Sequence, residues 1–89
     1  MSPLEVTDYL GRAILENRLS KDYSQKNLAE KARVSQEYIS MLENGKRKGH
    51  QIRTLQRISH SLGMELSELL RYAEKIMDSE TELNVRINS

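Results

Sequence analysis

The chain has 89 residues and no cysteine, so it suits one small domain that must be stabilised by packing or association, not by disulfides or thiolate-bound metal. Its composition, 37% hydrophobic and 30% charged, excludes an intrinsically disordered chain, and no apolar run approaches the roughly 18 residues that a membrane span needs. The net charge of +1 hides a local excess of positive charge in residues 44–64, which carry five basic side chains and no acidic one. This excess fits either a phosphate-binding face or a solvated surface.

The first predicted helix covers residues 3–18. Ser2 is suited to be its N-cap and Pro3 to be its first residue, and Glu5 completes a capping box with Ser2. Asp22, in the polar segment that follows, tolerates the left-handed conformation of a turn. One face of the helix is predicted to be buried, because apolar residues recur at spacings of three and four: Val6, Tyr9, Leu10, Ala13 and Ile14.

Two short helices are predicted next, over residues 25–32 and 36–43, with Ser24 and Ser35 as their N-caps. Small Ala29 is predicted to lie where the two helices approach each other most closely. The other apolar positions that bury the pair are Leu28, Ala32, Val34, Ile39 and Leu42. Two helices joined by so short a turn, the second leading into a basic loop, are typical of a helix-turn-helix motif.

Two more helices are predicted after the basic loop. Asn44 and Gly45 favour the left-handed conformation that ends a helix, and Gly63 does the same further on. A helix over residues 52–62 is predicted from Ile52, Leu55, Ile58 and Leu62. A last helix over residues 66–77 is predicted from Leu66, Leu69, Leu70, Ala73, Ile76 and Met77.

The tail, residues 78–89, has a different pattern. Leu83, Val85 and Ile87 alternate with polar residues, which is the period of a strand. A single strand has no sheet to join in an otherwise helical domain. We therefore interpret the tail either as disordered or as an arm that pairs with a partner chain.

The segments "YSQKNLAEKARVSQEYISMLENGKR" and "IRTLQRISHSLGMELSELL" resemble the Cro/repressor-type (XRE-type) helix-turn-helix domain, over about residues 9–72. Within that family the chain is similar to phage repressors and to the controller proteins of restriction-modification systems. The resemblance implies an all-α, compact five-helix bundle of the lambda-repressor-like type. Residues 1–77 would be its DNA-binding domain, and residues 78–89 a C-terminal tail or dimerisation arm.

The resemblance also implies which residues meet DNA. The base-reading side chains, at the start of the recognition helix, would be Ser35, Gln36, Glu37 and Ser40. The resemblance matches Gln25, Asn44, Lys46 and Arg47 to phosphate-binding positions. To this phosphate-binding set we add three residues from their chemistry and their place in the chain: Tyr38, Lys48 and Arg53. Glutamine suits adenine and glutamate accepts from cytosine, whereas lysine and arginine hold phosphates without specifying sequence. Tyr38 has a second interpretation, as a half-buried aromatic side chain that covers the junction of the two short helices.

The chain departs from the family pattern at several positions. Arg33 stands in the turn where most members have glycine or a small or polar residue, and a left-handed conformation there would cost roughly 1–2 kcal/mol. Asn17 replaces a residue that is often apolar. The loop of residues 45–51 is one residue longer than usual and lacks proline, and Glu65 replaces the usual serine or threonine cap.

The expected function is that of a sequence-specific, double-stranded-DNA-binding transcriptional regulator. It would act as a homodimer, formed through residues 66–77 and the tail, on a palindromic operator. The alternative is an antitoxin or adaptor that binds a protein partner through the helix-turn-helix domain and the acidic tail.

Other classes of protein are disfavoured. An enzyme is not expected, because the chain has no glycine-rich phosphate loop, no activated nucleophile and no paired carboxylates in a plausible pocket. No cofactor or metal is expected, since His50 and His60 are isolated from other ligand types. The N-terminal residues lack the features of a signal peptide, so we expect a cytoplasmic protein with no membrane contact.

Overall fold

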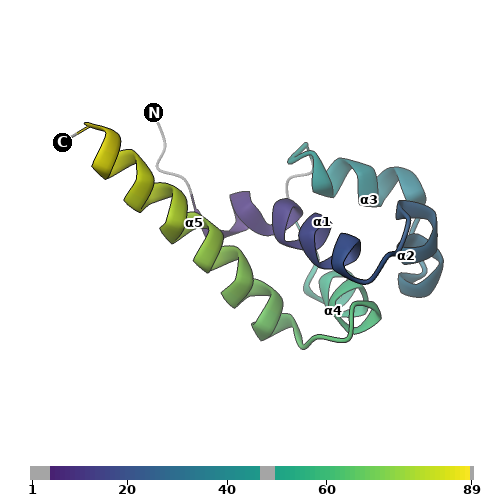
Figure 1. The fold of residues 1–89 in the computed structure, drawn as a ribbon. Coiled ribbons are helices and arrows are strands. Elements are labelled where there is room, and N and C mark those ends of the chain that lie inside the picture. Colours follow the sequence, from purple (N-terminus) through teal and green to yellow (C-terminus); the bar gives the residue numbers. More distant parts are fainter. Residues whose placement is uncertain (1–4, 47–49, 89) are drawn as a thin grey trace.

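The computed structural model describes residues 5–46 and 50–88, and only the backbone of residues 84–88. The chain forms a short 3₁₀ helix, η1 (Val6–Tyr9), and five α-helices (Figure 1). The α-helices are α1 (Leu10–Ser20), α2 (Gln25–Ala32), α3 (Gln36–Glu43), α4 (Ile52–Ser61) and α5 (Leu66–Asn88). Every element in the described residues is helical, which confirms the predicted all-α, five-helix fold. None of these helices has an apolar stretch long enough to cross a membrane.

The first predicted helix is divided into η1 and α1, and it starts later than expected. The proposed Ser2 cap lies outside the described residues. Glu5 is the N-cap of η1 instead, and its backbone N–H donates to Oδ2 of Asp8 at 2.6 Å, which completes a capping box. After α1, Asp22 has a φ of 59°, so the left-handed turn predicted at this residue is confirmed.

Helices α2 and α3 have the predicted boundaries, because local capping bonds define their N-terminal ends. The Ser24 hydroxyl accepts from the N–H of Asn27 at 2.9 Å, and the Ser35 hydroxyl accepts from the N–H of Tyr38 at 3.0 Å. Arg33 ends α2 in the left-handed conformation, with a φ of 58°. The strain expected at this departure from the family pattern is therefore present.

The core lies where the helices converge, and it contains most of the predicted apolar positions. Its buried side chains come from every α-helix: Leu10, Ala13, Ile14, Leu28, Ala29, Ala32, Ile39, Leu42, Leu55, Ile58, Leu62, Leu69 and Ala73. Ile52 is an exception, since 62% of its surface is exposed in the first turn of α4. A predicted core position at the very start of a helix can turn away from the body, as it does here.

Gly11 lies at a close approach between two helices, α1 and α3. A Cβ atom at this position would lie 1.8 Å from the backbone carbonyl oxygen of Leu42. No side chain can be accommodated at that distance, so glycine is required where α1 crosses the C-terminal end of α3.

The strand interpretation of the tail is wrong, because α5 continues without interruption to Asn88. Leu83 stands seven residues after Ile76, which puts both on one side of a helix. That helical spacing prevails over the short alternation that suggested a strand. The first half of α5 packs against α1, η1 and α4, and its C-terminal end extends past the other helices (Figure 1). The division of function between residues 1–77 and 78–89 stays a prediction.

Candidate nucleic-acid interface

Helix α3 has one buried face and one accessible face. Ile39 and Leu42 are buried against the core. Gln36 and Glu37 are exposed, as is the N-cap residue Ser35. The structure therefore brings the predicted base-reading residues together on an accessible surface. The fourth, Ser40, is half-buried one turn further along, and its hydroxyl accepts from the side-chain amide of Asn44 at 3.4 Å.

A buried ion pair anchors the C-terminal end of α3 to α1. The Arg18 Nε atom donates to Oε2 of Glu43 at 2.7 Å, and the Arg18 Nη2 atom donates to Oε1 at 2.9 Å. Only 9% of the Arg18 side chain and 3% of the Glu43 side chain are exposed. The bidentate hydrogen bonding raises the pKa of Arg18 against the opposing effect of burial, so the guanidinium stays charged.

The same ion pair also holds α2 and the loop that precedes it. The Arg18 Nη1 atom donates to the backbone carbonyl of Tyr23 at 2.8 Å, and the Gln25 amide nitrogen donates to Oε1 of Glu43 at 2.9 Å. One carboxylate thus receives hydrogen bonds from α1 and α2 while belonging to α3. Gln25, a predicted phosphate-binding residue, has one amide hydrogen engaged in this network and is half-exposed.

Arg18 and Glu43 were not among the predicted site residues, although one sequence signal points to Arg18. This residue follows Ile14 by four positions and Leu10 by eight, so it lies on the buried face of α1. A charged side chain on such a face requires a buried partner of opposite charge. Glu43 carries no comparable signal, because its partner is 25 residues away in the chain.

Three of the predicted phosphate-binding residues lie around the two ends of the loop after α3. Asn44 and Lys46 are exposed directly after this helix, where the backbone N–H of Lys46 donates to the carbonyl of Met41 at 2.9 Å. Arg53 is exposed in the first turn of α4. The remaining loop cations, Arg47 and Lys48, lie outside the described residues.

Tyr38 is half-buried and packs against the hydrophobic core. This position agrees with its interpretation as an aromatic side chain that covers the junction between α2 and α3. It does not test a contact between Tyr38 and DNA, which stays a prediction.

Comparisons with known proteins identify relatives of the whole domain. A family model described as "Helix-turn-helix" matches residues 14–69. The HTH-type transcriptional regulator SlrR of Bacillus subtilis is 34% identical in an alignment of 82 positions, which covers 88% of this chain and 54% of SlrR. The chain thus spans about half the length of this curated relative.

Solved structures agree with the family match. The clp gene regulator ClgR from Corynebacterium glutamicum superimposes with a TM-score of 0.79 and 30% identity, over 98% of this chain and 93% of the other. SinR, a master regulator for biofilm formation solved in complex with DNA, gives a TM-score of 0.65 and 34% identity, over 68% and 97% of the two chains. Because the family match covers more than half of its residues, the chain belongs to the XRE-type helix-turn-helix family of DNA-binding transcriptional regulators.

Proposed function

We propose that this chain is a sequence-specific regulator that binds double-stranded DNA as a homodimer at a palindromic operator, with α3 in the major groove. The observation that carries the proposal is the combination of a fixed backbone and a free polar face in α3. The buried pair between Arg18 and Glu43 fixes the helix, while Gln36 and Glu37 are exposed. A backbone that is already fixed in this way loses little conformational freedom when the helix meets DNA.

The exposed side chains have the chemistry for direct readout. A glutamine amide can donate to and accept from adenine, and a glutamate accepts from the amino group of cytosine. Each good bidentate contact discriminates against the wrong base by roughly 1–3 kcal/mol. Gln36 and Glu37 are therefore proposed to specify bases, with Ser35 and Ser40 making shorter hydroxyl contacts.

The positive residues around α3 supply the phosphate contacts of the proposal. Lys46 and Arg53 are exposed at the two ends of the loop, and Arg47 and Lys48 lie between them in the sequence. Gln25 and Asn44 would add neutral donors. Such contacts set the position of the protein on the duplex without reading its sequence.

Helix α5 is proposed as the dimer surface. Ile76 and Met77 are only half-buried, and Leu83 is 57% exposed on the part of α5 that extends past the body. A helical segment without neighbours is only marginally stable in water, so a partner would stabilise it. A twofold dimer would place two copies of α3 about 34 Å apart, to match half-sites one helical turn apart.

Selection of bound sites from a random duplex library tests this function. A palindrome with half-sites about one turn apart is expected, and the logarithm of affinity should fall with the logarithm of salt at a slope of about −0.9 per phosphate contact. Gln36→Ala should relax base preference at one position in each half-site, whereas the exposed Gln56→Ala on α4 should not. Recovery of no sequence above bulk DNA would refute the proposal.

A further inference from the structure

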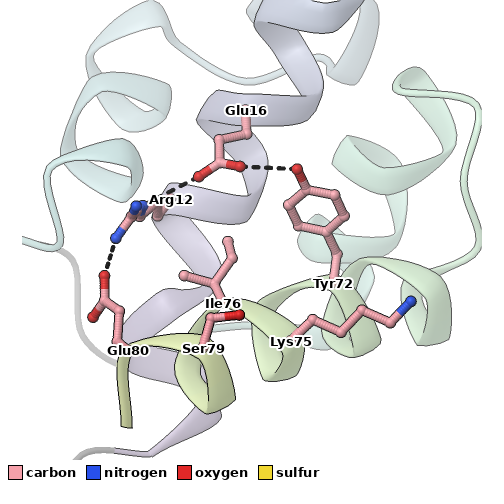
Figure 2. Close-up of a pocket in the computed structure, with 7 residues that line it drawn as sticks. All are labelled: Arg12, Glu16, Tyr72, Lys75, Ile76, Ser79 and Glu80. Atoms are coloured by element: carbon pink, nitrogen blue, oxygen red, sulfur yellow. Dashed lines mark hydrogen bonds and ion pairs between the residues drawn. The ribbon is translucent and has the colours of Figure 1, made fainter. Parts of the chain in front are cut away.

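A groove of about 310 Å³ lies between α1 and α5, next to the part of α5 that extends past the body (Figure 2). Two polar contacts bound it. At one end Arg12 bridges Glu16, with Nε and Oε2 3.1 Å apart, and also contacts Glu80. At the other end the Tyr72 hydroxyl donates to Oε1 of Glu16 at 2.8 Å. These contacts connect α1 and α5 on both sides of the opening.

Between the two contacts the groove is lined by Ile76, its one aliphatic residue. Ile76 points into the space between α5 and α1, and the short side chain of Ser79 stands beside it (Figure 2). The hydroxyl of Tyr72 donates to Glu16, and this hydrogen bond raises the pKa of the tyrosine. Arg12, Glu16, Tyr72 and Glu80 are thus engaged with one another, and Ile76 between them offers a surface for an apolar side chain.

Leu83 is an apolar side chain on the same helix that its own chain does not bury. It is 57% exposed, and it follows Ile76 by seven residues. Seven residues are two helical turns, or about 10.5 Å along the axis, so Leu83 projects from nearly the same side of α5 as Ile76. The helix thus carries an apolar knob and a groove lined by Ile76 on one side, two turns apart.

We infer that a second copy of this chain binds with its α5 antiparallel to the first, so that Leu83 of each copy enters the groove of the other above Ile76. This arrangement rests on the α5 dimer proposed above and specifies its register. Pairing residue 83 with residue 76 places the twofold axis between residues 79 and 80. Small Ser79 at the crossing lets the two helices approach closely. The contact is isologous, as a closed dimer requires.

One pair of charges on α5 agrees with this register, and each Glu80 carboxylate, which would lie near the axis, has its counter-charge in Arg12 of its own chain. Lys75 precedes Ile76 by one residue, and Glu82 precedes Leu83 by one residue. In an antiparallel pair with Leu83 over Ile76, Lys75 of each copy lies beside Glu82 of the other. Both side chains are exposed, and neither forms a hydrogen bond or ion pair with another residue that the structure describes. The dimer would therefore contain two symmetric ion pairs.

A single engineered cysteine tests the position of the twofold axis, because the chain has no cysteine of its own. Ser79→Cys is expected to give a disulfide-linked dimer on mild oxidation, since a disulfide forms only when the Cα atoms are about 4.4–6.8 Å apart. Glu74→Cys is the matched control: it is exposed on the opposite side of α5 and should stay monomeric under denaturing, non-reducing conditions. Cross-linking of Glu74→Cys but not of Ser79→Cys would overturn the register.

Charge exchange on the full chain provides a second test, read by sedimentation without DNA. Lys75→Glu and Glu82→Lys should each weaken dimerisation by about tenfold at low salt, and the double variant should restore it. Lys26→Glu, at an exposed position of α2, should have no effect on dimerisation. Failure of the double variant to recover would contradict the pairing.

Removal of the knob separates this inference from the proposed DNA-binding function. Leu83→Ala should weaken dimerisation by tenfold or more but leave the folded monomer and its affinity for one half-site unchanged, because Leu83 is exposed. A dimer that survives Leu83→Ala, or a wild-type chain that sediments as a monomer, would overturn the inference. A dimer with the predicted cross-link but without sequence-specific DNA binding would overturn the proposed function alone.

Discussion

Helices α3 and α5 have opposite relations to the body of the molecule. Helix α3 has eight residues, and it is held by a side-chain N-cap, by Ile39 and Leu42 in the core, and by the buried Glu43 at its last residue. Helix α5 has 23 residues, and it contacts α1 as far as Glu80, beyond which its C-terminal end extends past the other helices (Figure 1). The short helix depends entirely on its neighbours, and the long helix continues beyond them.

The surfaces that the two helices leave free also differ. Helix α3 exposes polar side chains on a backbone that is fixed at both ends, which suits the reading of a rigid ligand such as duplex DNA. Helix α5 exposes Leu83 on a segment that extends past the body, which suits association with another chain. The difference between these free faces is the basis on which we propose a different partner for each helix.

Loss of the buried Glu43 carboxylate, which helps to hold α3 in place, should have the largest effect on stability. Glu43→Ala leaves the Arg18 guanidinium buried without a counter-charge and leaves the Gln25 amide without its acceptor. We expect the free energy of unfolding to fall by roughly 3–5 kcal/mol, measured by urea denaturation. Glu37→Ala, an exposed change on the same helix, should alter it by less than about 0.5 kcal/mol. Similar losses for both variants would show that the ion pair does not anchor α3.

The close approach of α1 and α3 provides a second, smaller perturbation. Gly11→Ala forces a methyl group against the Leu42 carbonyl oxygen, so α3 must move away from α1. The expected cost is roughly 1–3 kcal/mol in unfolding free energy, even though alanine favours a helix more than glycine does. Lys26→Ala, at an exposed position of α2, is the control and should not destabilise the chain. An unchanged or higher stability for Gly11→Ala would contradict the packing described here.

The helix-turn-helix segment could be predicted from sequence because its boundaries depend on local chemistry. Ser24 and Ser35 each bond to a backbone N–H three residues away, and the left-handed residue Arg33 lies between the two helices. The anchor of α3 could not be predicted in the same way, since Arg18 and Glu43 meet only when the domain has folded. The pairing of Glu43 with Arg18 is therefore determined by the tertiary fold and not by the local sequence.

The end of α5 was mispredicted for a different physical reason. The alternation of Leu83, Val85 and Ile87 is compatible with a strand over a few residues, while the seven-residue spacing from Ile76 to Leu83 fits a helix. A short apolar pattern does not choose between these periods by itself. The preceding turns of α5, which pack on α1 and η1, supply a helical template that the following residues extend.

The smallest expected effect concerns the contact that holds α5 to α1 beside the groove. Tyr72→Phe removes the hydrogen bond to Glu16 and should lower the free energy of unfolding by about 1 kcal/mol at neutral pH. The hydrogen bond to Glu16, with a smaller contribution from burial, raises the pKa of Tyr72 in the folded chain above its usual value of 10.0.

The pH dependence of this difference follows from the direction of the shift. A group whose pKa is higher when folded contributes its full stability below the unfolded pKa and loses it as the pH rises through the folded pKa. The stability difference between wild type and Tyr72→Phe should therefore be constant from pH 7 to 9 and shrink above pH 10. Urea denaturation of both proteins over this range measures it. A difference that stays constant to pH 11 would mean that the bond to Glu16 does not hold α5 against α1.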